Sequence, residues 1–136
     1  MGNSNTVYVA KDRLISEGIG RVKRSDKFMD IGCGLRPINF FKPKMHLCIE
    51  PCEAYAKVIA NRYANEPGVL VIQEYANDAL RRMADDSIDV IYMADVIEHI
   101  TKETGQDILK ECIRVAKKQV VIFTPLGFMP QEYENI

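Results

Sequence analysis

The sequence predicts an α/β fold with an open, mainly parallel five-stranded sheet and helices on both of its faces. Five short segments are almost continuously apolar, which is typical of strands buried on both faces of a sheet. Amphipathic segments with helical spacing alternate with these runs. Alternating strands and helices indicate right-handed crossovers between parallel strands.

Each element follows from a local pattern. The expected strands cover residues 27–31, 45–49, 69–73, 88–93 and 119–123. The expected helices cover residues 9–20, 52–65, 78–83 and 101–118. Thr101 fits the N-cap of the last helix, and Lys117 and Lys118 suit the negative end of its dipole.

The first crossover of the predicted sheet is unusually short. Only ten residues separate Gly34 from Met45, and Pro37 and Pro43 are among them. A parallel crossover usually needs about ten to twelve residues including its helix. We therefore expect a single helical turn or no helix in this segment.

Composition limits the classes of protein and predicts one domain. The chain has 136 residues, 47% of them apolar, and a net charge of −1, which argues against disorder and against a general nucleic-acid-binding protein. The sequence shows no apolar run of membrane-spanning length and no signal pattern, so a cytoplasmic location without a membrane is expected. Residues 1–26 are interpreted as a disordered start and leading helix, 27–125 as a cofactor-binding core, and 126–136 as an irregular tail.

Cysteine spacing predicts thiols and no metal site. Cys48 and Cys52 form a C-x3-C pair, with no second pair and no nearby histidines at zinc-ligand spacing. Without a secretion signal, the four cysteines are expected to stay reduced.

The most informative motif follows the first strand. Asp30 is followed by Gly32, Cys33 and Gly34, so an acid and two glycines reach the edge of the sheet where open α/β sheets bind ligands. Glycine allows a sharp turn and a close backbone approach. A dinucleotide fingerprint would need a third glycine where Pro37 stands, which argues against a nicotinamide-dependent oxidoreductase.

Two further motifs follow in order. Glu50 ends the second strand, where an acid can accept hydrogen bonds from ribose hydroxyls. Residues 86–100 contain the fourth strand, opened by Asp89 and followed by Asp95 and then Glu98 and His99. Over roughly residues 27–125, the three motifs together resemble the class I S-adenosylmethionine-dependent methyltransferases, which have a Rossmann-like fold with strand order 3-2-1-4-5.

The resemblance implies S-adenosylmethionine as cofactor and assigns roles around its methionine portion. Asp30 would hold the amino group through water, and the backbone of Gly32, Cys33 and Gly34 would pass beside the methionine portion. Arg36 replaces the third glycine of the family's longer pattern. It would contact the methionine carboxylate or cap the shortened crossover.

The resemblance also assigns the nucleoside portion and the methyl group. Glu50 would bind the ribose hydroxyls and Pro51 would flank the adenine. Asp95 and Val96 would line the floor near the methionine and the transferred methyl. The adenine contact after the third strand is assigned to Tyr75 and Ala76 or, alternatively, to Asn77 and Asp78, with Tyr75 standing where the family often has an acid.

Glu98 and His99 are the candidate catalytic residues. A histidine at this edge of the sheet can act as a general base because its ordinary pKa lies near 6.5. The alternative is that both residues only pack at the start of the next helix. His46, at a strand start, is interpreted as structural.

The predicted function is methyl transfer from S-adenosylmethionine to a small-molecule or carbohydrate-type acceptor. The alternative is a non-catalytic S-adenosylmethionine-binding or interaction module on the same fold, because the family's two carboxyl-terminal hairpin strands are not found. The chain is therefore expected to be an incomplete copy, either truncated or completed by a partner, with the edge of the fifth strand free to pair in a homo-oligomer. In the tail, Leu126, Phe128 and Met129 are candidates for an acceptor pocket.

Overall fold

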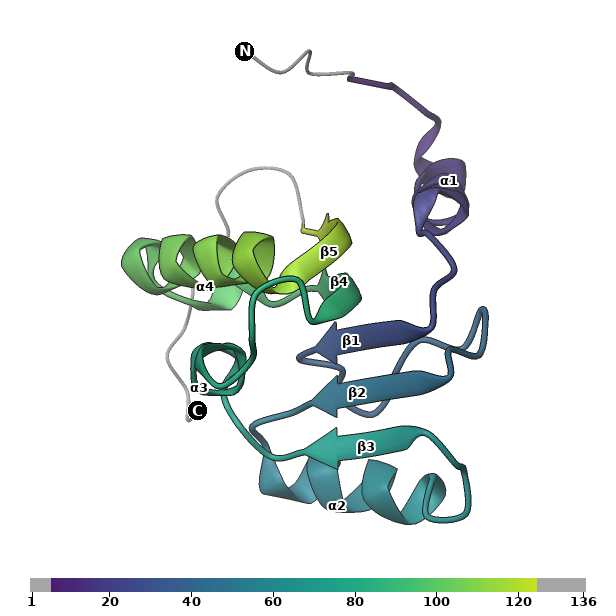
Figure 1. Ribbon diagram of the computed structural model, residues 1–136. Helices are drawn as coiled ribbons and strands as arrows, with labels where there is room; N and C mark the ends of the chain where they lie inside the picture. Colours follow the sequence, from purple (N-terminus) through teal and green to yellow (C-terminus); the bar gives the residue numbers. More distant parts are fainter. Residues whose placement is uncertain (1–5, 125–136) are drawn as a thin grey trace.

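The computed structural model describes residues 6–124 and contains the predicted alternation of strands and helices (Figure 1). The strands are β1 (Lys27–Ile31), β2 (Met45–Ile49), β3 (Val69–Ile72), β4 (Ile88–Ala94) and β5 (Ala116–Phe123). The helices are α1 (Leu14–Arg21), α2 (Glu53–Arg62), α3 (Ala76–Arg81) and α4 (Lys102–Val115), with short 3-10 turns η1 (Lys11–Arg13) and η2 (Ile97–His99).

The five strands form one parallel sheet in the order β3-β2-β1-β4-β5, as predicted. Ile31 pairs with Ile49 on one side and with Met93 on the other, so β1, β2 and β4 end at one edge. The chain crosses from β3 on one outer side to β4 on the other side of β1. This reversal creates the crevice in which open α/β sheets place ligands.

Successive strand residues alternate between two differently covered faces. On the helix face, α3 and α4 pack against a fully apolar layer that includes Met29, Ile91 and Met93. On the loop face, Phe28 and Val90 pack against residues of the 32–44 crossover, and Ile59 of α2 packs against Cys33 and Cys48. Figure 1 shows α4 and α3 on one side of the strands and α2 beside β3. Helices therefore lie on both faces, as predicted.

The β1–β2 crossover contains neither a helix nor a strand between residues 32 and 44, in agreement with its length and its two prolines. Aromatic packing holds it down instead, because the Phe41 ring meets the Phe28 ring edge-on at a centroid distance of 5.2 Å. The Ile38 N–H also donates to Asp30 Oδ2 at 2.7 Å.

The predicted helix over residues 101–118 is three residues too long. The Thr101 cap is confirmed, since its side chain accepts a hydrogen bond from the Thr104 N–H at 3.3 Å. However, the backbone becomes extended at Ala116, which already belongs to β5. Lys117 and Lys118 thus lie in the strand, and Lys118 Nζ approaches Asp89 Oδ1 at 3.7 Å. No glycine or proline marks this boundary, so apolar periodicity alone missed it.

Burial of all five strands on both faces is also a wrong prediction. It holds for the β1 and β2 residues beyond the first of each strand, but β3 and β5 are only half-buried, and Leu70 is 54% exposed. Both are outer strands, and the six-residue α3 is too short to cover the start of β3.

The leading helix begins later than predicted, with η1 followed by α1. Two hydrogen bonds hold the end of α1 and the segment after it against β5. Gln119 Nε2 donates to the Arg21 carbonyl and Gln119 Oε1 accepts from the Lys23 N–H, each at 2.8 Å. No helix within residues 6–124 is both long and apolar enough to cross a membrane. The predicted tail residues Leu126, Phe128 and Met129 lie outside the described residues.

Candidate functional site

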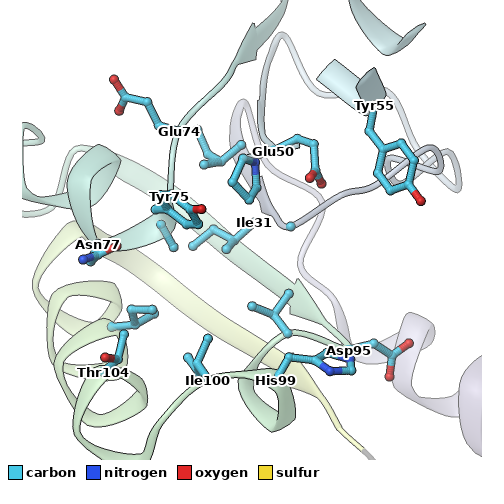
Figure 2. Close-up of a pocket in the computed structure, with 16 residues that line it drawn as sticks. Ile31, Glu50, Tyr55, Glu74, Tyr75, Asn77, Asp95, His99, Ile100 and Thr104 are labelled. Atoms are coloured by element: carbon cyan, nitrogen blue, oxygen red, sulfur yellow. The ribbon is translucent and has the colours of Figure 1, made fainter. Parts of the chain in front are cut away.

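A cavity of about 400 Å³ lies at the carboxyl ends of β1, β2, β3 and β4, next to α3 and α4 (Figure 2). We call it the helix-side pocket. Most of its wall is apolar, with Ile31 and Ile49 on the strands and Ile108 on α4. The predicted site residues that line it are Gly32, Glu50, Pro51, Tyr75, Ala76, Asp95, Val96 and His99.

Glu50 joins two loops at the mouth of this pocket. Its Oε2 accepts a hydrogen bond from the Gly34 N–H at 2.8 Å, and its Oε1 accepts one from the Cys52 N–H at 2.9 Å. Glu50 is only 6% exposed, so these two N–H groups stabilise a buried carboxylate. Each oxygen accepts one bond in this arrangement and can accept another from a ligand hydroxyl.

Gly32 and Gly34 shape the turn that follows β1. Both have a positive φ, +62° and +55°, which favours glycine. A Cβ atom on Gly32 would also collide with the Val96 side chain. The turn therefore lets backbone, rather than side chain, border the pocket. Gly34 itself does not line the pocket and instead fixes Glu50 through its N–H.

Asp95 occupies a strained position at the end of β4. Its φ is +54°, a value uncommon for residues other than glycine but tolerated by Asp and Asn. The Asp95 N–H donates to the Phe123 carbonyl at 2.9 Å, which fixes this bend against β5. The side chain is exposed at the sheet edge, where backbone strain often accompanies function.

The loop after β3 supplies Tyr75, Ala76 and Asn77 to the pocket wall, whereas Asp78 does not line it and lies 3.9 Å from Arg81. Glu74, which the sequence reading missed, also lines the pocket and pairs with Arg82. β3 ends at Ile72 rather than residue 73, which brings Glu74 closer to the edge than expected. Tyr55, Ile100 and Thr104 were missed as well, because they come from helices or turns that fold back over the edge.

Asp30 and Cys33 line a different cavity of about 410 Å³ beneath the crossover, which we call the loop-side pocket. Arg36, Asn39 and Tyr92 also line it. Gly32 and Asp95 border both pockets, so the two cavities meet at the ends of β1 and β4.

Asp30 is the buried acid of the loop-side pocket, only 3% exposed. Its Oδ2 accepts the Ile38 N–H bond and lies 3.5 Å from His46 Nε2. Burial raises the pKa of Asp30 above its ordinary value, and the nearby His46 ring and the hydrogen bond from the Ile38 N–H oppose this rise. Burial by itself would lower the pKa of His46, but Asp30 and the Cys48 thiol raise it to about 9. His46 is therefore an ionic partner of Asp30 as well as a packed side chain, which the sequence reading did not foresee.

Only one of the two candidate catalytic residues lines the helix-side pocket. His99 lines the helix-side pocket and is half-exposed, with its Nε2 3.7 Å from Glu98 Oε1 (Figure 2). Glu98 does not line that pocket; its Oε2 accepts a hydrogen bond from the Thr124 hydroxyl at 3.4 Å. Only His99 is brought to the helix-side pocket.

The strand order, the glycine turn after β1 and the acid after β2 together define a class I, Rossmann-like methyltransferase fold. Solved structures with this fold agree. A protein from Pyrococcus horikoshii has a TM-score of 0.66 at 20% identity, over 85% of this chain and 52% of that one. An S-adenosylmethionine-dependent methyltransferase from Leishmania major has a TM-score of 0.66 at 17% identity, over 78% and 47%.

A third similar structure is Haemonchus contortus phosphoethanolamine N-methyltransferase 1 in complex with phosphoethanolamine and S-adenosylhomocysteine, with a TM-score of 0.65 at 14% identity, over 73% of this chain and 22% of that one. The chain thus spans about half, or less, of these proteins. The family described as "Methionine biosynthesis protein MetW" matches residues 13–134, and the chain belongs to this family. No curated protein matches the chain.

Proposed function

We propose that the chain binds S-adenosylmethionine across the helix-side and loop-side pockets and transfers its methyl group to a small-molecule or carbohydrate-type acceptor. One observation carries the proposal. Eight of the residues that the sequence assigns to the cofactor, counting the alternative Asn77, line the helix-side pocket: Gly32, Glu50, Pro51, Tyr75, Ala76, Asn77, Asp95 and Val96. The solved methyltransferases of similar fold support the same cofactor.

The residues present fit the nucleoside portion of this cofactor. The Glu50 carboxylate is held by two backbone N–H groups and keeps lone pairs for the two ribose hydroxyls. Tyr75, Ala76 and Asn77 offer a flat side chain and polar groups beside an apolar wall, which suits an adenine ring.

The residues of the loop-side pocket fit the methionine portion. Gly32 and Cys33 present backbone there, Asp30 carries an acid toward the pocket, and the exposed Arg36 lies along its wall. An amino group suits the acid and a carboxylate suits the guanidinium. The sulfonium would then lie near Gly32 and Asp95, where the two pockets meet.

When bound, the cofactor supplies an electrophilic methyl group on a sulfonium. The chain contributes chiefly alignment, because transfer of this group depends on holding donor and acceptor in line. Glu50 and the glycine turn would orient the donor, and the apolar wall of the helix-side pocket would pack against it. His99 is the candidate general base for an acceptor that must lose a proton.

Calorimetry with S-adenosylhomocysteine tests the cofactor site. Glu50→Ala should weaken binding by about 1–3 kcal/mol, since hydrogen bonds to a charged group are lost. Glu53→Ala is the matched control, because Glu53 is exposed on α2 and pairs with Lys57 across one helical turn. Equal affinities for the two variants, or no binding by the folded wild-type protein, would contradict the proposal.

The second candidate is the non-catalytic S-adenosylmethionine-binding or interaction module. A methyl-transfer assay separates the two functions once cofactor binding is established. His99→Ala should retain cofactor affinity, and turnover that also survives would exclude His99 as the base.

A further inference from the structure

A third cavity lies between α1 and the ends of β4 and β5. It has a volume of about 260 Å³ and is lined by Ile15, Tyr92, Ala94, Asp95, Phe123 and Thr124. We call it the strand-5 pocket. Ile15 comes from α1. This helix contributes Ile19 to the loop-side pocket and no residue to the helix-side pocket.

The strand-5 pocket shares lining residues with both of the other pockets. Asp95 lines all three cavities, and Tyr92 and Ala94 line both the strand-5 and the loop-side pockets. A molecule in the strand-5 pocket therefore reaches the point where the helix-side and loop-side pockets join. Under the proposed function, this is where the sulfonium methyl would lie.

The walls of the strand-5 pocket favour a cation attached to an apolar body. The Tyr92 and Phe123 rings lie 5.7 Å apart between centroids, inclined at 54°, and Ile15 adds a 67% exposed aliphatic side chain. Asp95 is the one charged residue among the six lining residues named above. Aromatic faces together with a carboxylate are the groups that recognise an ammonium ion.

The charges around Tyr92 also favour a cationic ligand over an anionic one. Burial raises the pKa of the Tyr92 phenol, and the carboxylates of Asp30 and Asp95 raise it further. The phenol therefore stays neutral, and the two acids make an anionic ligand unfavourable at the shared wall. Arg36, which could attract an anion, lines the loop-side pocket and is not among the strand-5 lining residues.

We propose that the strand-5 pocket is the acceptor site and that the acceptor is a small primary or secondary amine with an apolar body. The assignment rests on the proposed function. In the transfer step, the bound ammonium first releases one proton to water, and the lone pair of the resulting neutral amine attacks the methyl carbon. The C–N bond forms as the C–S bond breaks, and that electron pair stays on sulfur. The nitrogen then releases a proton to water, while Asp95 accepts a hydrogen bond from the remaining N–H.

Nuclear magnetic resonance titration of the full chain tests the acceptor class. The probes are phenethylamine, 2-phenylethanol and phenylacetate, which share one apolar body and differ in charge. Each is titrated with and without S-adenosylhomocysteine. We expect phenethylamine to bind about tenfold more tightly than phenylacetate, with the largest shift changes at Ile15, Tyr92 and Phe123. Equal or tighter binding of phenylacetate or 2-phenylethanol would overturn the proposal, as would shift changes confined to another part of the chain.

Two variants and one control locate the site. Asp95→Asn keeps the size of the side chain and tolerates the positive φ, and should weaken phenethylamine binding about tenfold. Phe123→Leu alters the strand-5 pocket and neither of the other two, so amine binding should weaken about threefold with unchanged S-adenosylhomocysteine affinity. Asp86→Asn is the control, because Asp86 is the other residue with a positive φ that is not glycine within residues 6–124 and lines none of the three pockets.

S-adenosylhomocysteine affinity in the same samples separates the two proposals. Cofactor binding with no amine binding would overturn the acceptor assignment alone. No cofactor binding by the folded protein would overturn the proposed function and, with it, the acceptor assignment. Amine affinity that is equal in the wild type, Asp95→Asn and Phe123→Leu would place the amine outside this pocket and also overturn the assignment.

Discussion

The two faces of the sheet are built from the same strands but carry different chemistry. On the helix face, α3 and α4 cover an apolar layer in which Met29, Ile91 and Met93 are fully buried. On the loop face, the 32–44 crossover covers β1 and β2 without a helix, and Asp30 and His46 are buried with it. Buried polarity in the strands is thus found on the face where the β1–β2 crossover has no helix.

The backbone of the segments that cover each face explains why buried polar side chains are found on the loop face. A helix satisfies most of its own N–H and C=O groups, whereas an irregular segment needs partners from elsewhere. In the crossover, the Ile38 N–H bonds to Asp30, and the Leu35 carbonyl accepts a hydrogen bond from Arg62 at 2.6 Å. Asp30 thus stabilises the loop and also reaches the loop-side pocket, so one buried acid links the stability of the fold to the candidate site.

The largest expected change in the free energy of unfolding comes from a substitution on the helix face. Ile91→Ala should lower the free energy of unfolding by about 2–5 kcal/mol, because it leaves a cavity in a fully buried apolar layer. Ile113→Ala on α4 is the matched control, since Ile113 is 71% exposed. Urea denaturation measures both. A loss no larger than that of the control would mean that the helix face is loosely packed.

A smaller effect is expected on the loop face. Asp30→Ala in the ligand-free protein should cost about 1–3 kcal/mol of unfolding free energy, because the Ile38 N–H loses its acceptor. Asp26→Ala is the control, because Asp26 is exposed and its carboxylate lies 3.8 Å from Lys44 Nζ. Urea denaturation again provides the measurement, and equal midpoints for the two variants would refute a structural role for Asp30.

The smallest effect is the pH dependence of the Asp30–His46 pair. Burial tends to lower the pKa of His46, but Asp30 and Cys48 raise it to about 9 in the folded protein, above the ordinary value of 6.5. The contribution of His46 to stability is therefore complete below about pH 6.5 and is lost as the pH rises through about 9. Cys48 contributes with the opposite sign over the same range, because its pKa is lowered to about 6, so the two contributions offset each other in the wild type.

The two histidines of the chain provide the test of that pH dependence. The difference in unfolding free energy between the wild type and His46→Gln should shrink as the pH rises from about 6.5 to about 9, whereas the difference between the wild type and His99→Gln should show no such trend, as measured by urea denaturation at each pH. The groups that face His46 are Asp30 on β1 and Cys48 on its own strand. A difference between the wild type and His46→Gln that stays the same at every pH would contradict a raised His46 pKa.

Much of the fold follows from local signals. The strand positions follow from continuous apolar runs, and the helix-free crossover follows from ten residues that include Pro37 and Pro43. The Thr101 cap follows from a side chain suited to an exposed N–H. The α4–β5 boundary could not be predicted, because Ala116 leaves the helix without a breaking residue and is held by pairing with Ile88.

Parts of the candidate site follow from the sequence, and other parts follow only from the tertiary structure. The sequence by itself determined the strand ends that carry Gly32, Glu50 and Asp95, because the order of strands and turns along the chain fixes them. Only the tertiary structure decided that Asp30 lies in a different cavity from Glu50, that His46 is its partner, and that Asp95 joins three pockets. These facts depend on which face each side chain occupies and on which distant segment covers it. Local patterns do not encode such contacts, which form only when the crossover, α1 and β5 pack at one edge.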